Sequence, residues 1–305
     1  MTNPKPSRSA IYFKAVRAFS FPASMVPCLV GAMLALLIGE NVSWWLMPFI
    51  AISLILLHAA SNVTTDYDDY NAGVDREETL GGSRVLVEKL LEPREMLRFG
   101  LILFTLAVIV GIPIILERGL TILILGIAGI LGGYFYTAKP FSFKYRAMGD
   151  ILIFLMYGPA IVAGTFYALT GTFNWSAVYA SVPLGLLITG ILQANNLRDI
   201  LHDRKANIKT LATIFGEGFA KGEYVFLIAG AYVVVIILVA VKILPVWSLL
   251  VILSIPIAIK NIGMIKGVKI EDTGKIAMLD AMTAQLTLVF GVLLSLSLLL
   301  SKLLS

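Results

Sequence analysis

The sequence predicts an all-α integral membrane protein with nine transmembrane helices around a central cavity. The N-terminus is expected in the cytoplasm and the C-terminus on the outer side of the membrane. Two observations lead to this fold class. The mean hydropathy is +0.90 and only 14% of the residues are charged, whereas soluble domains carry about 25%. The apolar runs are also long enough for helices of roughly 20 residues, which is the length that crosses a bilayer.

Nine apolar runs have the length of a membrane-spanning helix. In chain order they cover residues 19–39, 43–61, 97–116, 119–136, 151–169, 175–194, 224–242, 245–265 and 281–301. The basic segment before the first run lacks a short apolar core followed by a small-residue cleavage site. We therefore expect the first run to be retained as a span rather than removed as a signal peptide.

The charged residues collect on alternate connections between these runs. With the N-terminus inside, all 24 Lys and Arg residues fall on the inner side except Arg118, Lys242 and Lys302. Because positive charge accumulates on cytoplasmic loops, this distribution sets the predicted orientation. Of the 19 acidic residues, only Glu40 and Glu117 fall outside. We expect the active site on the cytoplasmic side of a multi-pass protein of the cell (plasma) membrane.

Composition excludes several other classes of protein. The single cysteine, Cys28, lies inside a predicted span, which excludes an internal disulfide framework and a zinc cluster. His58 and His202 are too few for a histidine metal centre. The net charge of +5 follows from membrane topology and does not indicate nucleic-acid binding. No linker divides the chain and nothing indicates an obligate protein partner, so we expect one domain over residues 1–305.

Two acidic motifs follow predicted spans at their inner ends. They are Asn62, Asp66 and Asp69 after the second run, and Asn195, Asp199 and Asp203 after the sixth. Their matched positions suggest two weakly related halves, about residues 1–145 and 146–305. The residues of each motif share one helical face, where like charges repel. A helix C-terminus disfavours anions by a further ~0.3–1 kcal/mol, so a cation is needed. Oxygen ligands favour Mg²⁺.

Mg²⁺ in proteins usually joins one or two carboxylates to the phosphates of a substrate. A phosphorylated ligand between the motifs is therefore predicted, and phosphate also needs basic partners. The turn Gly81-Gly82-Ser83-Arg84 offers flexible backbone N–H groups that can approach phosphate. The basic candidates on the inner loops are Arg84, Lys139, Lys144, Arg198 and Lys209. One such motif is equally well explained as solvated loop residues, whereas two matched motifs favour a site.

Six segments along the chain form a recognisable pattern: "RAFSFPAS" (Arg17–Ser24), "NVTTDYDDYNAGVD" (Asn62–Asp75), "GGSRVL" (Gly81–Leu86), "YTAKPFSFKY" (Tyr136–Tyr145), "NNLRDILHD" (Asn195–Asp203) and "KTLA" (Lys209–Ala212). In this order they resemble the UbiA superfamily of intramembrane prenyltransferases. Within the superfamily the pattern is most similar to the 1,4-dihydroxy-2-naphthoate prenyltransferases of menaquinone synthesis. Thr65 stands where the family usually has Asn, and Asn207-Ile208 replaces a common Gly-Lys pair.

The resemblance implies transfer of a prenyl group from an isoprenyl diphosphate to a small aromatic acceptor, with Mg²⁺ as the cofactor. Asp66, Asp69, Asp199 and Asp203 are the implied metal ligands, and Asn62 completes the implied catalytic set. Arg17 joins the basic candidates as a diphosphate ligand. Asn195, Tyr136 and Tyr157 are the other implied substrate contacts. We expect Asp75 only to hold its loop and Asp68 to be solvated. His202 is expected to face away from Asp199 and Asp203 as an ordinary loop residue.

Two alternatives to this reading remain. The same reaction on 4-hydroxybenzoate, homogentisate, haem or a glycerol phosphate lipid fits the motifs equally, because the departures at Thr65 and Asn207-Ile208 weaken the assignment to one acceptor. An ion transporter is the rival from another class, since charged residues at membrane depth often mark ion pathways. A transporter predicts ionisable residues at the middles of spans, where this sequence has almost none.

Overall fold

The computed structural model of the protein describes residues 6–77 and 81–304, and every regular element within these residues is helical. The α-helices in chain order are α1 (Arg8–Ala15), α2 (Pro22–Ile38), α3 (Met47–Asn71), α4 (Pro93–Arg118), α5 (Leu120–Tyr134), α6 (Gly149–Leu155), α7 (Ile161–Thr170), α8 (Trp175–Lys205), α9 (Leu211–Phe215), α10 (Glu217–Ala240), α11 (Ile255–Ile265) and α12 (Leu279–Leu304). A π-helical turn, Met156–Ala160, joins α6 to α7, and a 3₁₀ segment, Val246–Ser254, leads into α11.

The prediction of nine spans is confirmed only in part. Among the described residues, seven helical segments are long and apolar enough to cross a membrane. The first predicted span corresponds to α2, which reaches that length only together with the α1 segment across a bend of 53°. The fourth corresponds to α5, whose 15 residues extend about 22 Å, less than the ~30 Å of a bilayer core. The remaining seven predicted runs match the seven segments.

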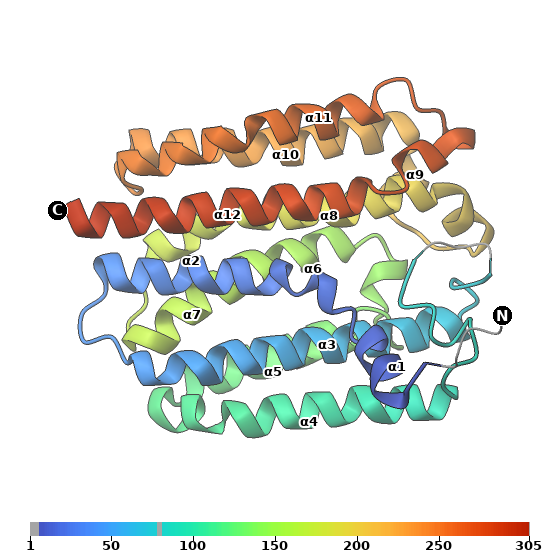
Figure 1. The fold of residues 1–305 in the computed structure, drawn as a ribbon, viewed down its shortest axis with the longest axis horizontal. Coiled ribbons are helices and arrows are strands. Elements are labelled where there is room, and N and C mark those ends of the chain that lie inside the picture. The colour runs from blue at the N-terminus through green and yellow to red at the C-terminus, as the bar shows by residue number, and fades with distance from the viewer. Residues whose placement is uncertain (1–5, 78–80, 305) are drawn as a thin grey trace.

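The helices lie side by side in one bundle with two different ends (Figure 1). One end holds α1, α9 and the long charged connections that follow α3, α5 and α8, whereas the C-terminal end of α12 lies at the opposite end. α3 and α8 have 25 and 31 residues, or roughly 38 and 46 Å. Both are longer than a bilayer core.

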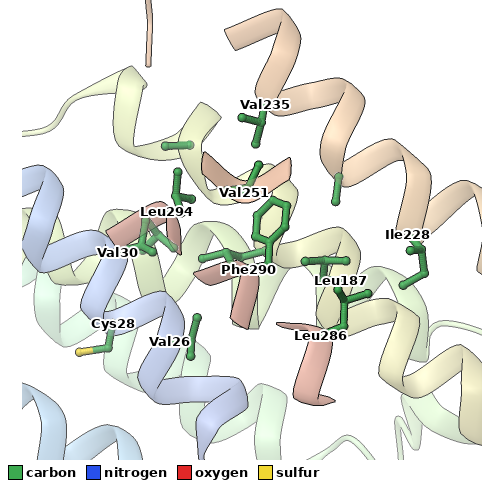
Figure 2. Close-up of a cluster of buried hydrophobic side chains, with 14 of the residues drawn as sticks. Val26, Cys28, Val30, Leu187, Ile228, Val235, Val251, Leu286, Phe290 and Leu294 are labelled. Carbon is green, nitrogen blue, oxygen red and sulfur yellow. The ribbon is translucent and has the colours of Figure 1, made fainter. Parts of the chain in front are cut away.

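The larger core joins α2, α7, α8, α10 and α12. Figure 2 shows its centre, where Phe290 of α12 lies among aliphatic side chains from neighbouring helices. The ring also meets Tyr232 of α10 edge to face, with centroids 5.3 Å apart. Small residues bring helices together: a Cβ on Gly31 of α2 would lie 2.5 Å from the carbonyl oxygen of Val162 in α7. Such close backbone contacts are typical of helix packing in membranes.

A second core holds the first motif and its loop against α1, α3 and α4. Val85 and Leu86 of the loop are buried there beside Val63 of α3. The loop ends where Glu92 and Glu95 form a capping box and Pro93 starts α4, an arrangement that satisfies orphan N–H groups at a helix start. The packing of this loop therefore fixes residues 81–92 over the end of α3.

Candidate functional site

The first acidic motif occupies the last turns of α3, and its two predicted metal ligands are buried. Asp66 is 3% exposed and Asp69 is 5% exposed. The backbone N–H of Ser83 donates to Oδ2 of Asp66 at 2.7 Å, and Nη1 of Arg17 lies 3.4 Å from Oδ1. Buried carboxylates need such partners because desolvation of the charge is costly. The Gly81–Arg84 turn predicted to approach phosphate thus also holds Asp66.

Gly82 allows a third carboxylate to reach this cluster. Its φ is +70°, and a Cβ there would lie 2.7 Å from Oδ2 of Asp75 and 3.2 Å from Oδ1 of Asp66, so only glycine fits. Burial, and secondarily the charge of Asp69, raises the pKa of Asp75 to about 7. Asp75 was expected only to hold its loop. Its carboxyl instead faces that of Asp66 across Gly82.

Asp69 receives two donors from the loop between α5 and α6. Nζ of Lys144 lies 2.7 Å from Oδ2, and the hydroxyl of Tyr145 donates to Oδ1 at 2.7 Å. Burial disfavours the charged form of Lys144, but the carboxylate of Asp69 outweighs it and, with a smaller contribution from Asp203, raises the lysine pKa above its ordinary value. The ion pair with Asp69 therefore favours the charged form of Lys144 beside the first motif.

Backbone pairing between two loops brings the second motif to Lys144. The N–H of Ala147 donates to the carbonyl of Lys209 at 2.6 Å, and the N–H of Lys209 donates to Tyr145 at 3.2 Å. The N–H of Ile208 in turn donates to the carbonyl of Asp203 at the end of α8. The predicted meeting of the two motifs thus depends on this short loop pairing, which no motif spacing encodes.

In the second motif, Asp203 is buried, whereas Asp199 is held by its neighbour. Nε and Nη2 of Arg198 donate to the two oxygens of Asp199 at 2.9 and 2.7 Å, and Nη1 donates to Asp280 of α12 at 3.0 Å. Arg198, expected to bind diphosphate, is therefore already engaged by two carboxylates. Asp280 was not singled out by sequence reasoning, because it lies far from both motifs in the chain.

A polar network fixes the bend between α1 and α2, where Arg17 adopts a left-handed backbone with φ of 55°. The amide of Asn62 donates to the carbonyl of Val16 and to the hydroxyl of Ser20, both at 3.0 Å. Ser20 also donates to the Arg17 carbonyl and contacts Nε2 of His58 at 3.2 Å. Asn62, expected to be catalytic, thus holds the turn that presents Arg17.

A cavity of about 430 Å³ extends from this polar end into the bundle. Its polar lining at the charged end includes Arg17, His58, Asn62, Tyr136 and Tyr157. The rest of the wall is mainly apolar and comes from α3, α4, α5 and α7. Nε of Arg17 is buried without a hydrogen-bond partner among the described atoms, which indicates a missing polar ligand because buried donors are otherwise satisfied. The cavity therefore has one polar end and a long apolar body.

The other predicted residues lie around this centre. Arg84 contacts Glu88 at 3.6 Å, and Lys139 and Lys209 are exposed. Asn195 is half-buried on α8, outside the cavity lining. Thr65, the departure from the family pattern, is buried and lines the cavity.

The expected solvation of Asp68 is not met. Asp68 is half-buried and accepts a hydrogen bond from the hydroxyl of Thr137 at 2.9 Å, because the loop after α5 folds back over α3. His202, expected to be a loop residue, lies instead in the last turns of α8 and is half-buried.

The carboxylates suit a hard cation only together with a ligand. Within residues 6–77 and 81–304, no three His, Cys, Asp or Glu side chains are arranged to hold a metal ion by themselves. Mg²⁺ rarely uses an all-protein cage and is commonly bound through one or two carboxylates and the phosphates of a substrate. The buried carboxylates Asp66, Asp69 and Asp203 fit that mode of binding.

Besides Asp280, sequence reasoning missed three contributors to the site. Ser83 acts through its backbone and Tyr145 through a hydroxyl aimed at Asp69, although both occur inside the quoted segments. His58 was considered only as a metal ligand, yet it stacks edge to face on Tyr157 with centroids 5.3 Å apart. The signal that could have found His58 is a polar residue four positions before Asn62, on the same helical face.

Comparison with known proteins gives the family. The model of the UbiA prenyltransferase family matches residues 24–279. The 1,4-dihydroxy-2-naphthoate octaprenyltransferase of Bacillus subtilis (strain 168) is 31% identical over 304 residues, which cover 97% of this chain and 94% of the relative. UbiA prenyltransferase domain-containing protein 1 of Homo sapiens is 32% identical over 237 residues, covering 76% of this chain and 68% of that protein.

Solved structures share the fold. A UbiA homolog from Archaeoglobus fulgidus bound to DMAPP and Mg²⁺ superposes with a TM-score of 0.64 at 16% identity, over 93% of this chain and 99% of that chain. The same homolog bound to GPP and Mg²⁺ gives 0.64 at 17% identity, with the same coverage. The helical bundle, the match over residues 24–279 and the full-length relative agree: the chain belongs to the UbiA prenyltransferase family and is a membrane prenyltransferase.

Proposed function

We propose that the protein transfers a prenyl group from an isoprenyl diphosphate to 1,4-dihydroxy-2-naphthoate in menaquinone synthesis. The observation that carries this proposal is the cavity, whose polar end adjoins the acidic motifs and whose apolar body extends among α3, α4, α5 and α7. One ligand with a charged head and a long apolar tail matches both parts. The acceptor is suggested by the relative from Bacillus subtilis, which aligns over nearly the whole chain.

The four carboxylates Asp66, Asp69, Asp199 and Asp203 would hold Mg²⁺ together with the diphosphate. When bound, the ion would neutralise charge that develops on the departing diphosphate. Lys144 adds a fixed positive charge beside the first motif, and the unpartnered Nε of Arg17 is available to a diphosphate oxygen. Fixed charges in a water-poor site need no reorganisation during reaction, which is why they stabilise a developing charge well.

Cleavage of the allylic C–O bond would place a carbocation at the polar end of the cavity. The aromatic rings of Tyr136 and Tyr157 line this end, and ring faces attract cations. An electron-rich acceptor ring then attacks the cation to form the new C–C bond, and a naphthoate loses carbon dioxide as aromaticity returns. Enclosure among helices keeps water from capturing the cation.

The membrane placement is part of the same proposal. We place the N-terminus and the acidic motifs on the cytoplasmic side of the plasma membrane and the C-terminus outside, in a single domain of two related halves. The support is the distribution of Lys and Arg, of which all but Arg118, Lys242 and Lys302 fall on one side. The diphosphate head of the donor would then enter the site from the cytoplasm, and its prenyl tail would enter from the lipid.

Purified protein should prenylate 1,4-dihydroxy-2-naphthoate when supplied with an isoprenyl diphosphate and Mg²⁺. We expect excess EDTA to abolish product formation and added Mg²⁺ to restore it, because the carboxylates need the ion to bind the diphosphate. Product is measured by chromatography and mass spectrometry. The same assay is run with 4-hydroxybenzoate, homogentisate, haem and a glycerol phosphate lipid as alternative acceptors. Transfer to another of these acceptors in place of the naphthoate would replace the proposed substrate. Cation flux into liposomes without any transfer would favour a transporter.

Asn62→Ala is expected to raise the KM for the prenyl diphosphate by about 10-fold, with a smaller change in kcat. The substitution removes both hydrogen bonds that hold the turn carrying Arg17, so the guanidinium loses its fixed position. Asn71→Ala is a matched control, since its amide donates only to the carbonyl of Tyr67 on the exposed end of α3. If kcat alone falls and KM is unchanged, Asn62 acts in the chemical step and not through Arg17.

A further inference from the structure

The apolar body of the cavity has glycines in its wall that serve neither packing nor a special backbone conformation. On α5, a Cβ at Gly132 would meet Met156 Sδ at 3.1 Å and one at Gly133 would meet Ser61 at 3.3 Å, so these two permit close helix contacts. A Cβ at Gly126 would have no heavy atom within 4 Å. Its φ also lies outside the left-handed region. The usual structural reasons for a glycine are therefore absent at Gly126.

Glycine in a helix interior costs about 1 kcal/mol relative to Ala, so an unexplained helical glycine points to a need for space. Gly126 lines the cavity. Three further glycines line it with their nearest neighbour in ordinary contact: Gly111 of α4 and Gly164 of α7 at 3.7 Å, and Gly129 of α5 at 3.9 Å. Gly129 lies about one turn nearer the acidic motifs than Gly126, whereas Gly111 and Gly164 are placed like Gly126 along their helices. Gly126 alone among Gly111, Gly126 and Gly164 has no atom within 4 Å of its Cβ position, and all three line the cavity.

The three glycines lie at one level of the bundle. α5 contacts both α4 and α7, and each glycine lies about two turns from the end of its helix opposite the acidic motifs. That end is Arg118 for α4, Leu120 for α5 and Thr170 for α7. We call Gly111, Gly126 and Gly164 the glycine ring.

The cavity continues past the glycine ring. Ile114, Ile122 and Ala168 lie beyond it and still line the wall. In the other direction, Gly126 precedes Tyr136 by ten residues in sequence, which corresponds to ~15 Å if α5 continued to that position. A short tail held at the polar end would stop before the ring, whereas a long one would have to pass it.

We propose that the glycine ring is the passage through which a long prenyl tail extends, and that Gly126 determines the longest donor accepted. This inference rests on the proposed function, because it concerns the tail of the same donor. A side chain at position 126 would project into the open space and divide the cavity. The polar end, where the diphosphate and the acceptor bind, would keep its shape.

The test compares a short and a long donor in the same enzyme. With Gly126→Leu we expect kcat/KM for octaprenyl diphosphate to fall by about 10- to 100-fold, while the value for geranyl diphosphate stays within about 3-fold of the unchanged enzyme. Gly126→Ala should shift the same ratio in the same direction by less. Gly222→Leu on α10 is the matched control, because its Cβ position is equally open and it does not line the cavity.

The outcomes separate the inference from the proposed function. If the unchanged enzyme transfers both donors and Gly126→Leu keeps the original long-to-short ratio, Gly126 does not limit the tail and the inference is overturned. An equal loss with both donors in a variant of unchanged thermal stability also overturns it, because the damage would then lie at the polar end. If the unchanged enzyme uses neither donor, the proposed function itself fails.

Discussion

Replacing Asp66 with Asn is expected to lower the rate of prenyl transfer by about 100- to 1,000-fold without unfolding the protein. Asn keeps the size of the side chain and an oxygen that accepts from the N–H of Ser83, the strongest contact of Asp66 at 2.7 Å. It removes the charge that the proposed ion needs. The loss should appear in kcat at saturating donor, and the Mg²⁺ concentration for half-maximal activity should rise.

Asp68→Asn is the matched control for this variant, since Asp68 is two residues away on the same helix. Its carboxylate accepts from the hydroxyl of Thr137, away from the Asp66 and Asp69 pair, and Asn can accept the same bond. Activity within about 3-fold of the unchanged enzyme is expected. An Asp66→Asn variant that keeps full activity with normal Mg²⁺ dependence would remove the first motif from the proposed mechanism.

Gly31→Ala is expected to lower the Tm of the detergent-solubilised protein by about 3–10 °C, the largest stability effect that we predict for a single methyl group. The added Cβ would lie 2.5 Å from the Val162 carbonyl oxygen and 2.9 Å from Cβ of Thr165. Backbone cannot rotate away as a side-chain tip can, so α2 and α7 must separate. Thr165 lines the cavity, and donor binding should weaken as well.

Gly222→Ala adds the same methyl group, but we do not expect it to lower the Tm. A Cβ at Gly222 would have no heavy atom within 4 Å, so the gain of about 1 kcal/mol in helix propensity is unopposed and the Tm should stay or rise slightly. Thermal unfolding followed by intrinsic fluorescence measures both variants. Equal Tm values for Gly31→Ala and the unchanged protein would mean that α2 and α7 do not pack as closely as described.

The helical class and most of the spans were predictable because apolar runs of membrane length have few other solutions. Seven of the nine predicted runs match helices of sufficient length. The two exceptions have a local cause: α5 ends after 15 residues, and α2 meets α1 at a bend of 53°. Hydropathy averaged along the sequence includes the apolar residues on both sides of a break, but it carries no information about a change in chain direction.

Local spacing predicted part of the candidate site but not its arrangement. Helical spacing placed Asp66 and Asp69 on one face, and both are buried together. The same reasoning treated Arg198 as a phosphate ligand, whereas Asp280 from a distant helix engages it. Asp68 was expected in solvent, yet Thr137 folds over it. Both contacts are made by a residue from another part of the chain.

By itself the sequence determined the all-helical membrane class, the family and the residue types of the site, because each depends on composition, local spacing or a quoted motif. Tertiary structure decided that Lys144 pairs with Asp69, that Asp75 reaches Asp66 across Gly82, and that Gly126 faces open space. The physical reason is the distance along the chain over which each kind of signal acts. Hydropathy and helical periodicity act over one helix, whereas ion pairs and cavities depend on which helices and loops become neighbours.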